Sequence, residues 1–288
     1  MNSSIQHSPL VCPVCGKPLV QDAKTCRCES GHSFDPAKEG YINLLLSHQR
    51  RSSHPGDDDK MIQARRRFFD SGAFDLVTEQ IKKSAIGNHQ SAILDCGCGE
   101  GHFLGTLSES RDGQFFGVDV SKEAVRCAAK RYRKAKWIVA NGMRKLPFAD
   151  HSLDVILSVL APRNPEEFAR ILKPDGALIL GVPGPNHLIE LRSRLAANAG
   201  DFEEKADEAA AKCAPHFKET HRELLSYQQP LSATQLADLI QMTPIFWCSS
   251  PEAKAEVQKL DQLTVTVSFV LLTLHSAQPP CGKVVLKI

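Results

Sequence analysis

The fold of this chain is decided by the stretch Ala92-Ile93-Leu94-Asp95-Cys96-Gly97-Cys98-Gly99-Glu100-Gly101-His102. Its apolar run ends at Asp95 and gives way to alternating glycines, which predicts a buried strand that turns sharply into a loop opening a helix. Gly97, Gly99 and Gly101 have no Cβ atom, so the backbone can turn tightly and a ligand can lie against the main chain. The stretch therefore predicts a ligand-binding strand–loop–helix unit.

Two nucleotide-like ligands compete for such a loop. The dinucleotide fingerprint GxGxxG needs a third glycine three residues after the second, and counted from Gly97 and Gly99 that position is His102. The remaining pattern, Asp-x-Gly-x-Gly-x-Gly with Glu100 inside the loop, resembles the first motif of class I S-adenosylmethionine (SAM) methyltransferases. Because SAM has no pyrophosphate, the loop would lie beside the amino-acid end of the cofactor rather than beside phosphates.

A second acidic residue supports a nucleoside ligand. Residues 114–120 are predicted to form the next strand, and Asp119 at its tip could accept hydrogen bonds from both ribose hydroxyls. Alternatively, Asp119 and Ser121 precede a predicted helix over 122–133, where an aspartate is an ordinary N-cap. The glycine loop and the acid together, in a β–α–β context, favour the ribose contact.

Composition sets broad limits on the function. The chain has 288 residues, of which 42% are hydrophobic and 24% charged, as in a soluble globular protein with one large domain and room for a small companion. It has no apolar run long enough for a transmembrane helix, and residues 1–10 lack a signal-peptide pattern, so we expect a cytoplasmic protein with no membrane partner. A net charge of +2 is too small to indicate nucleic-acid binding, which local clusters would have to provide.

The N-terminal segment contains a metal-ligand pattern formed by Cys12, Cys15, Cys26, Cys28 and His32. Two cysteines three apart can bend round one ion, and a second pair about a dozen residues later closes the tetrahedral shell of a structural zinc site. So small a segment has little core, so zinc would supply its folding free energy. Unligated thiols are the alternative. Cys26 and Cys28 cannot easily both bind alongside His32, and we favour Cys28 with His32.

The later chain predicts the rest of an α/β sheet. Residues 137–142, 153–160 and 177–182 are expected to be strands, and their carboxyl ends would face the ligand crevice. Asn141 is placed where it could hold an adenine edge. Residues 200–230 are acidic and predicted to be helical, as an insertion over the sheet, while 263–274 could form an antiparallel edge hairpin.

Basic residues between the zinc pattern and the sheet are candidate phosphate contacts. Arg50 and Arg51 lie in a charged segment broken by Pro-Gly, and Arg65 to Arg67 lie in a predicted helix. A solvated loop and a solvated helix face are the alternatives. We predict a small zinc module over 1–45, a linker over 46–59 and a methyltransferase domain over 60–288, and the family resemblance described next implies that the zinc ribbon of 1–45 is an RNA-recognition module.

Several motifs occur along the chain in a distinctive order. The zinc ribbon joined to Phe-Asp-x-Ala-Lys-Glu-Gly-Tyr is the motif most specific to one family, because the glycine loop alone occurs in many methyltransferases. They are Cys-Pro-Val-Cys (12–15), Gly-His-Ser-Phe-Asp-Pro-Ala-Lys-Glu-Gly-Tyr-Ile-Asn-Leu (31–44), Gln-Ala-Arg-Arg (63–66), Leu-Asp-Cys-Gly-Cys-Gly-Glu-Gly (94–101), Asp-Val-Ser-Lys (119–122), Pro-Gly-Pro-Asn-His-Leu (183–188) and Gln-Met-Thr-Pro (241–244). From Cys12 to about Trp247, the chain resembles the RlmA-type 23S ribosomal RNA guanine-N1 methyltransferases.

This resemblance implies a class I SAM-dependent methyltransferase fold, with a seven-stranded, mostly parallel sheet, an antiparallel edge hairpin and a small N-terminal zinc module. It also implies one structural Zn²⁺ on Cys12, Cys15, Cys28 and His32. SAM contacts are implied at Gly99, Glu100, His187 and position 74, where relatives of the first subgroup carry Tyr and this chain has Phe74. Together with the residues argued above, the predicted cofactor-binding set is Phe74, Asp95, Gly97, Gly99, Glu100, Gly101, Asp119, Asn141 and His187.

The resemblance further implies a substrate, a hairpin loop in domain II of 23S rRNA. Two subgroups methylate neighbouring guanines there, 745 and 748, and residues 51–57 resemble the Gram-negative 745 subgroup more closely. Guanine N1 lies on the Watson–Crick edge, so the base must be unpaired or flipped, and its proton needs an acceptor that the sequence does not identify. A small-molecule methyltransferase and a non-catalytic RNA-binding protein are the rival classes. The oligomeric state stays open, a homodimer included.

Overall fold

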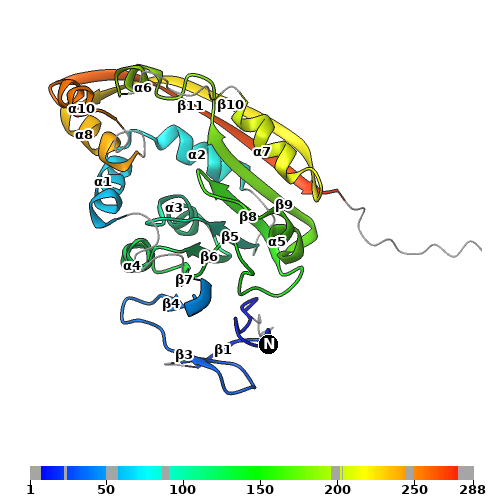
Figure 1. Cartoon of the computed structure of the whole chain (residues 1–288). Coiled ribbons are helices and arrows are strands. Elements are labelled where there is room, and N and C mark those ends of the chain that lie inside the picture. Colours follow the sequence, from blue (N-terminus) through cyan, green and yellow to red (C-terminus); the bar gives the residue numbers. More distant parts are fainter. Residues whose placement is uncertain are drawn as a thin grey trace, which may run out of the picture.

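A large sheet with helices on both faces forms the body of the molecule, and a small three-stranded sheet lies at its N-terminal end (Figure 1). The computed structural model describes residues 8–22, 25–49, 58–85, 91–195, 202, 204–243 and 249–277. Within these ranges no helix has the length and apolar content needed to cross a membrane. The predicted linker arginines Arg50 and Arg51, and the 51–57 stretch, lie outside the described residues.

The large sheet has the strand order β10-β11-β9-β8-β5-β6-β7-β4. All neighbours from β9 to β4 are parallel, whereas β11 is antiparallel to both β9 and β10. The order reverses at β5, because the chain first adds β6 and β7 on one side and then β8 and β9 on the other. The strands are β4 (Ile42–Asn43), β5 (Ala92–Cys96), β6 (Gln114–Asp119), β7 (Lys136–Val139), β8 (Leu153–Val159), β9 (Leu172–Pro183), β10 (Phe217–Ser232) and β11 (Gln262–Ser276).

Alternating side chains of the central strands enter two separate cores, because successive residues of a strand point to opposite faces. Ile93 packs in one cluster and Leu94 in the other. Helices α5 and α7 cover the Leu94 face, and most of the remaining helices cover the Ile93 face. The helices are α1 (Asp59–Asp70), α2 (Asp75–Ser84), α3 (His102–Ser110), α4 (Lys122–Arg131), α5 (Pro165–Ile171), α6 (Ile189–Leu195), α7 (Lys205–Cys213), α8 (Ala233–Met242), α10 (Pro251–Val257) and the short 3-10 helix η1 (Ser47–Gln49).

The predicted fold class is confirmed, with two differences in detail. The seven expected strands are joined by an eighth, β4, which pairs in parallel with β7. The expectation of helix through residues 200–230 is wrong beyond α7, since β10 pairs with β11 along its length. Charged side chains on the open side of this edge strand make its sequence resemble a polar helix, and pairing with β11 overrides that local preference.

The N-terminal module docks on the loop that precedes β8. Its three strands are β1 (Val20–Gln21), β2 (Cys26–Arg27) and β3 (Ser33–Phe34). Leu10 forms an antiparallel bridge with Phe148, and the Val11 amide donates to the carbonyl oxygen of Pro147 at 2.9 Å. Leu10 and Phe148 are both buried in the Leu94-side core. This shared core fixes the module on one face of the large sheet.

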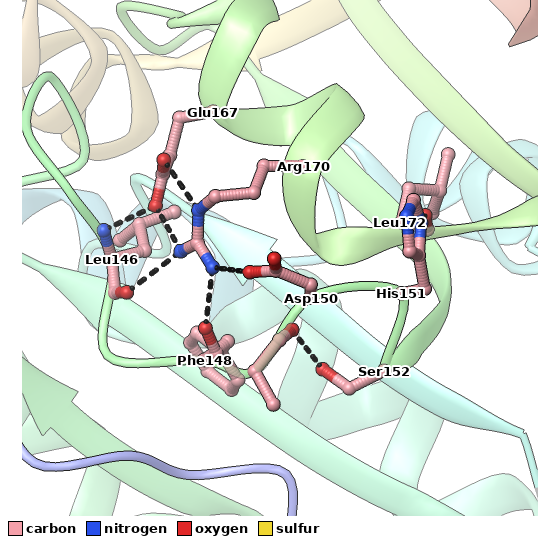
Figure 2. A network of polar contacts seen from close by, with 9 residues as sticks. Leu146, Phe148, Asp150, His151, Ser152, Glu167, Arg170 and Leu172 are labelled. Carbon is pink, nitrogen blue, oxygen red and sulfur yellow. Dashed lines mark hydrogen bonds and ion pairs between the residues drawn. The ribbon is translucent and has the colours of Figure 1, made fainter. Parts of the chain in front are cut away.

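The docking loop is itself held by α5 through one arginine (Figure 2). Arg170 donates to the carbonyl oxygens of Leu146 at 3.1 Å and Phe148 at 2.9 Å, and it pairs with Asp150 at 2.6 Å. It also binds the buried carboxylate of Glu167, which accepts a hydrogen bond from the Leu146 amide. One guanidinium therefore joins α5 to the loop that carries the module.

Replacing Arg170 with Ala is expected to destabilise the fold by about 3 kcal/mol, because a buried carboxylate and two carbonyls lose their donor. Arg222→Ala is the matched control, since Arg222 binds Glu219 and Asp207 on the surface and should contribute less than about 1 kcal/mol. Urea unfolding of both variants measures the difference. Equal losses of unfolding free energy in the two variants would mean that the Arg170 network stabilises the fold no more than a surface ion pair does.

Candidate active site and metal centre

A cavity of about 600 Å³ opens at the carboxyl ends of the central strands, beside the reversal of strand order at β5. In open α/β sheets this is where ligands bind. Seven of the nine predicted cofactor residues line it, whereas Asp95 lies buried beneath the loop and Gly101 lies outside the lining. The seven are Phe74, Gly97, Gly99, Glu100, Asp119, Asn141 and His187.

Two of the loop glycines are required by close packing. Gly97 has φ +86°, and a Cβ atom there would lie 2.3 Å from the Cβ of Ala161, which follows β8. Gly101 also has φ +86°, and its Cβ would clash with Trp137 at 2.5 Å. Gly97 thus lets the loop pass along the cavity wall, while Gly101 lets α3 begin close to β7.

Asp119 ties the tip of β6 to the glycine loop. One carboxylate oxygen accepts from the Gly99 amide at 2.9 Å and the other from the Ser121 amide at 2.8 Å. The N-cap of α4 is Ser121, whose hydroxyl accepts from the Ala124 amide. Asp119 is therefore not a helix cap, and its carboxylate lines the cavity.

Two further carboxyl groups make the base of the site acidic. Burial, reinforced by the charges of Asp119 and Glu100, raises the pKa of Asp95 to about 8. Burial likewise raises the pKa of Glu100 to about 7, against the opposing effect of Arg65. Oδ2 of Asp95 has no hydrogen-bond partner within the described ranges. Such a site favours a bound cation, and SAM carries a positively charged sulfur and an amino group, so the residues fit this cofactor.

The opposite wall is aromatic and neutral. His102 stacks on Phe69 with ring centroids 4.3 Å apart, and Phe74 contacts His187 edge to face at 6.2 Å. Nδ1 of His187 accepts a hydrogen bond from the Ser268 amide at 3.2 Å. Burial lowers the pKa of both histidines to about 4, so both are uncharged near pH 7.

Phe69 and His102, which the sequence did not single out as contacts, line the cavity, and so does Arg65, which was considered only as a phosphate contact. For His102, the only sequence signal of a place at the cavity is its position at the end of the glycine loop. Phe69 reaches the cavity only because α1 folds over that loop. Asn141 also lines the cavity, although its side-chain amide donates to the Gln49 carbonyl and accepts a hydrogen bond from the Met143 backbone amide. It therefore orders the loop after β7.

The arginines of α1 point in three directions and do not form the shared phosphate cluster considered from the sequence. Arg65 lines the cofactor cavity, and Arg66 approaches Asp70 at 3.9 Å. Arg67 makes a two-pronged contact with Asp238 of α8, at 2.6 Å and 3.0 Å. A helix turns about 100° per residue, so consecutive side chains cannot share one face.

The metal-ligand pattern forms a compact group. The ligand atoms of Cys12, Cys15, Cys28 and His32 all lie within 4.8 Å of one another. Nδ1 of His32 is 3.4 Å from the Cys28 sulfur and 3.6 Å from that of Cys12. Zinc–sulfur bonds of about 2.3 Å and a zinc–nitrogen bond of about 2.0 Å require similar separations, so three thiolates and one imidazole fit a tetrahedral Zn²⁺.

The local backbone separates Cys28 from Cys26. The Cys28 amide donates to the His32 carbonyl and the Gly31 amide to the Cys28 carbonyl, so a tight turn brings Cys28 and His32 together. Cys26 belongs to β2, and its side chain is buried in the core shared with the large sheet. It is not part of the ligand group found in the described residues.

The arrangement of class I SAM-dependent methyltransferases is a parallel sheet whose strand order reverses beside a glycine loop, with an acidic cavity of nucleoside size at that point. Residues 94–180 match a family model described as a methyltransferase domain, and residues 10–53 match the zinc-ribbon model described as RlmA, N-terminal. A solved structure from work on converting a disulfide bond into a thioacetal group in echinomycin biosynthesis matches with TM-score 0.50 and 12% identity, covering 72% of this chain and 83% of that chain. This likeness concerns the fold alone.

Two curated relatives narrow the class. The 23S rRNA (guanine(748)-N(1))-methyltransferase of Streptomyces fradiae is 34% identical over 91% of this chain and 95% of its own. A putative 23S rRNA (guanine-N(1)-)-methyltransferase of Micromonospora griseorubida is also 34% identical, with the same coverage. The chain belongs to this family of zinc-ribbon 23S rRNA (guanine-N1)-methyltransferases.

Proposed function

We propose that the enzyme transfers the methyl group of SAM to N1 of a guanine in a hairpin loop of 23S rRNA domain II, at position 745. The observation that carries the reaction is the coupling of an RlmA-type zinc ribbon to the acidic SAM cavity in a single chain. Position 745 rests on the resemblance of residues 51–57 to that subgroup. Position 748 is the alternative, because the Streptomyces fradiae relative is named for it.

Tritiated methyl transfer from SAM to 23S rRNA that lacks both modifications tests the proposal, followed by primer extension to map the blocked base. A stop at 745 supports the proposal, and a stop at 748 would assign the methylation to guanine 748 instead. Label on another base, or on small molecules only, would contradict the function.

We assign the cofactor as follows. Asp119 accepts hydrogen bonds from the ribose hydroxyls of SAM, and the loop at Gly97 and Gly99 lies along its amino-acid end. The aromatic wall at Phe74 and His187 encloses the remainder of the cofactor. The bound cofactor supplies an electrophilic methyl group on a positively charged sulfur. Burial raises the pKa of Asp95 to about 8 and that of Glu100 to about 7, so these carboxyl groups would favour that charge only in their ionised forms, increasingly as pH rises through these values.

The residues after β8 define where the guanine approaches. Leu160, Ala161 and Pro162 line the cavity, and none of their side chains can accept a proton. We infer that this part of the wall positions the base by packing rather than by proton transfer, so that N1 can meet the methyl group in line. The group that takes the N1 proton is not assigned.

The zinc ribbon is proposed to grip the hairpin, with one Zn²⁺ holding Cys12, Cys15, Cys28 and His32 together. Residues 1–45 would form this module, 46–59 the linker and 60–288 the methyltransferase domain, with β4 of the first segment joining the module to the large sheet. We place the reaction in the cytoplasm, where ribosomal RNA is accessible, and a homodimer is compatible with this assignment.

Asp119→Ala is expected to raise the dissociation constant of SAM by one to two orders of magnitude, because the ribose loses charge-assisted hydrogen bonds of roughly 1.5 to 3 kcal/mol. Calorimetry measures the change. Asp175→Ala is the matched control, since Asp175 is exposed near the amino end of β9, away from the cavity. Unchanged affinity in a folded Asp119→Ala protein would limit this residue to holding the loop.

A further inference from the structure

A second cavity, of about 320 Å³, adjoins the cofactor cavity on the other side of the loop that follows β8. Leu160 lines both cavities, and Arg163 lines only the second. The floor comes from the end of β9, at Val182 and Pro183. The two cavities therefore meet at Leu160, on the wall of the first cavity where the target guanine is proposed to lie.

The wall of the second cavity is basic. Lys205, Glu208 and Lys212 lie on one face of α7, because residues three to four apart on a helix are neighbours. Lys205 pairs with Glu208 at 2.9 Å. With Arg163 opposite, three cations face one carboxylate.

Arg163 has an unusual environment for a cation. Its Nε atom is buried and has no hydrogen-bond partner in the described part of the chain. Burial lowers its pKa, as expected for a guanidinium that has lost water without gaining a carboxylate. A planar guanidinium held in this way is ready to bind an anion, and phosphate matches its donor geometry.

Leu160 separates the two cavities in a strained conformation. Its φ is +52°, in the left-handed region that leucine rarely adopts, and its amide donates to the Gly181 carbonyl at 2.9 Å. This backbone leaves the side chain 51% exposed between the cavities. Strain of this kind persists at functional sites, and an apolar side chain here can pack against an extruded base.

We propose that the second cavity binds the backbone phosphate that adjoins the target guanosine, with Arg163 and Lys212 as its ligands and Leu160 between phosphate and base. The proposal rests on the proposed function, because it requires a nucleotide whose base lies in the first cavity. It identifies Arg163 as a substrate-binding residue and the loop 160–163 as the place where the target nucleotide bends.

The first test compares methylation kinetics of wild type, Arg163→Ala, Arg163→Lys and Lys212→Ala. Arg163→Ala should raise the KM for rRNA about tenfold to a hundredfold, leave kcat at saturating RNA within about twofold and leave SAM affinity unchanged. The logarithmic salt dependence of RNA binding should fall by about 0.7 for the lost contact. Arg163→Lys should recover part of the KM, and Lys212→Ala should act in the same direction as Arg163→Ala.

Lys259→Ala is the matched control, because Lys259 is exposed after α10 and lines neither cavity. Arg163→Ala should keep the thermal midpoint of wild type, since Arg163 has no ion pair among the described residues to lose. A lowered midpoint with an unchanged KM would make Arg163 structural and overturn the proposal. So would a KM and salt slope equal to those of Lys259→Ala.

A second measurement does not depend on rRNA methylation. Guanosine and guanosine 3′,5′-bisphosphate are titrated into the SAM-loaded protein, and the bisphosphate should bind at least about tenfold more tightly to wild type. This advantage should largely disappear in Arg163→Ala. Equal affinities of the two probes for wild type would refute the phosphate site, whereas failure to methylate 23S rRNA would refute only the proposed function.

Discussion

Cys28→Ser is expected to lose the zinc ion and unfold the N-terminal module, while Cys26→Ser keeps one zinc per chain. Cys28 supplies a thiolate to the group with Cys12, Cys15 and His32, whereas Cys26 is buried in the same hydrophobic cluster as Cys12 and Cys28 but is not a member of the ligand group. Structural zinc contributes roughly 10–16 kcal/mol to folding in small zinc domains, so its loss is one of the largest effects available in this chain. Metal analysis by mass spectrometry gives the zinc content directly.

The paired variants also separate the two parts of the molecule. Cys26→Ser buries a hydroxyl and should lower stability by about 1–3 kcal/mol without metal loss. Cys28→Ser should bind SAM as wild type does, because the SAM cavity lies at the carboxyl ends of the central strands, whereas the ligand group belongs to the module that docks on the loop before the start of β8. This variant should nevertheless lose rRNA methylation. Zinc loss in Cys26→Ser with retention in Cys28→Ser would reverse the ligand assignment.

The central fold could be predicted from sequence because its signals are local. The apolar run ending at Asp95 and the glycines that follow specify a strand, a tight turn and a helix within about twenty residues. The same holds for β6 with its terminal Asp119. The zinc pattern is also local, since ligand spacing within one short segment limits which side chains can meet.

Features that depend on distant partners could not be predicted. The local sequence of the 16-residue strand β10 predicts helix, because its partner β11, which supplies the pairing, begins about thirty residues later. The sequence leaves Arg67 as a candidate phosphate contact, but in the fold α8 places Asp238, 171 residues away in sequence, against its guanidinium. The second cavity combines the loop after β8, the end of β9 and α7, and no single stretch of sequence carries that arrangement.

The dissociation constant of SAM is expected to fall by about one to two orders of magnitude as pH rises from 6 to 8. Burial raises the pKa of Glu100 to about 7 and that of Asp95 to about 8, so below these values the groups carry protons that oppose a bound cation. Each proton released on binding changes the affinity by up to tenfold per pH unit. Calorimetry in buffers of different ionisation enthalpy measures both the affinity and the proton release.

The stability of the SAM-free protein should change in the opposite direction. Both carboxyl groups have folded-state pKa values above their unfolded values, so their contribution is fully present below about pH 4 and is lost as pH rises through 7 and 8. The thermal midpoint without SAM should therefore decline across this window from these two groups. The increase in midpoint caused by SAM should be larger at pH 8 than at pH 6.

Glu100→Gln isolates one of the two groups. At pH 6 wild-type Glu100 is mostly protonated and resembles glutamine, so the two proteins should bind SAM with similar affinity; at pH 8 wild type should bind about tenfold more tightly. Glu79→Gln is the matched control, because Glu79 lies on the surface of α2 and outside the cavity, and its pKa is lowered by Lys82. If wild type and Glu100→Gln differ by the same factor at both pH values, Glu100 is ionised throughout, and the acidic base of the cavity does not couple cofactor binding to protons.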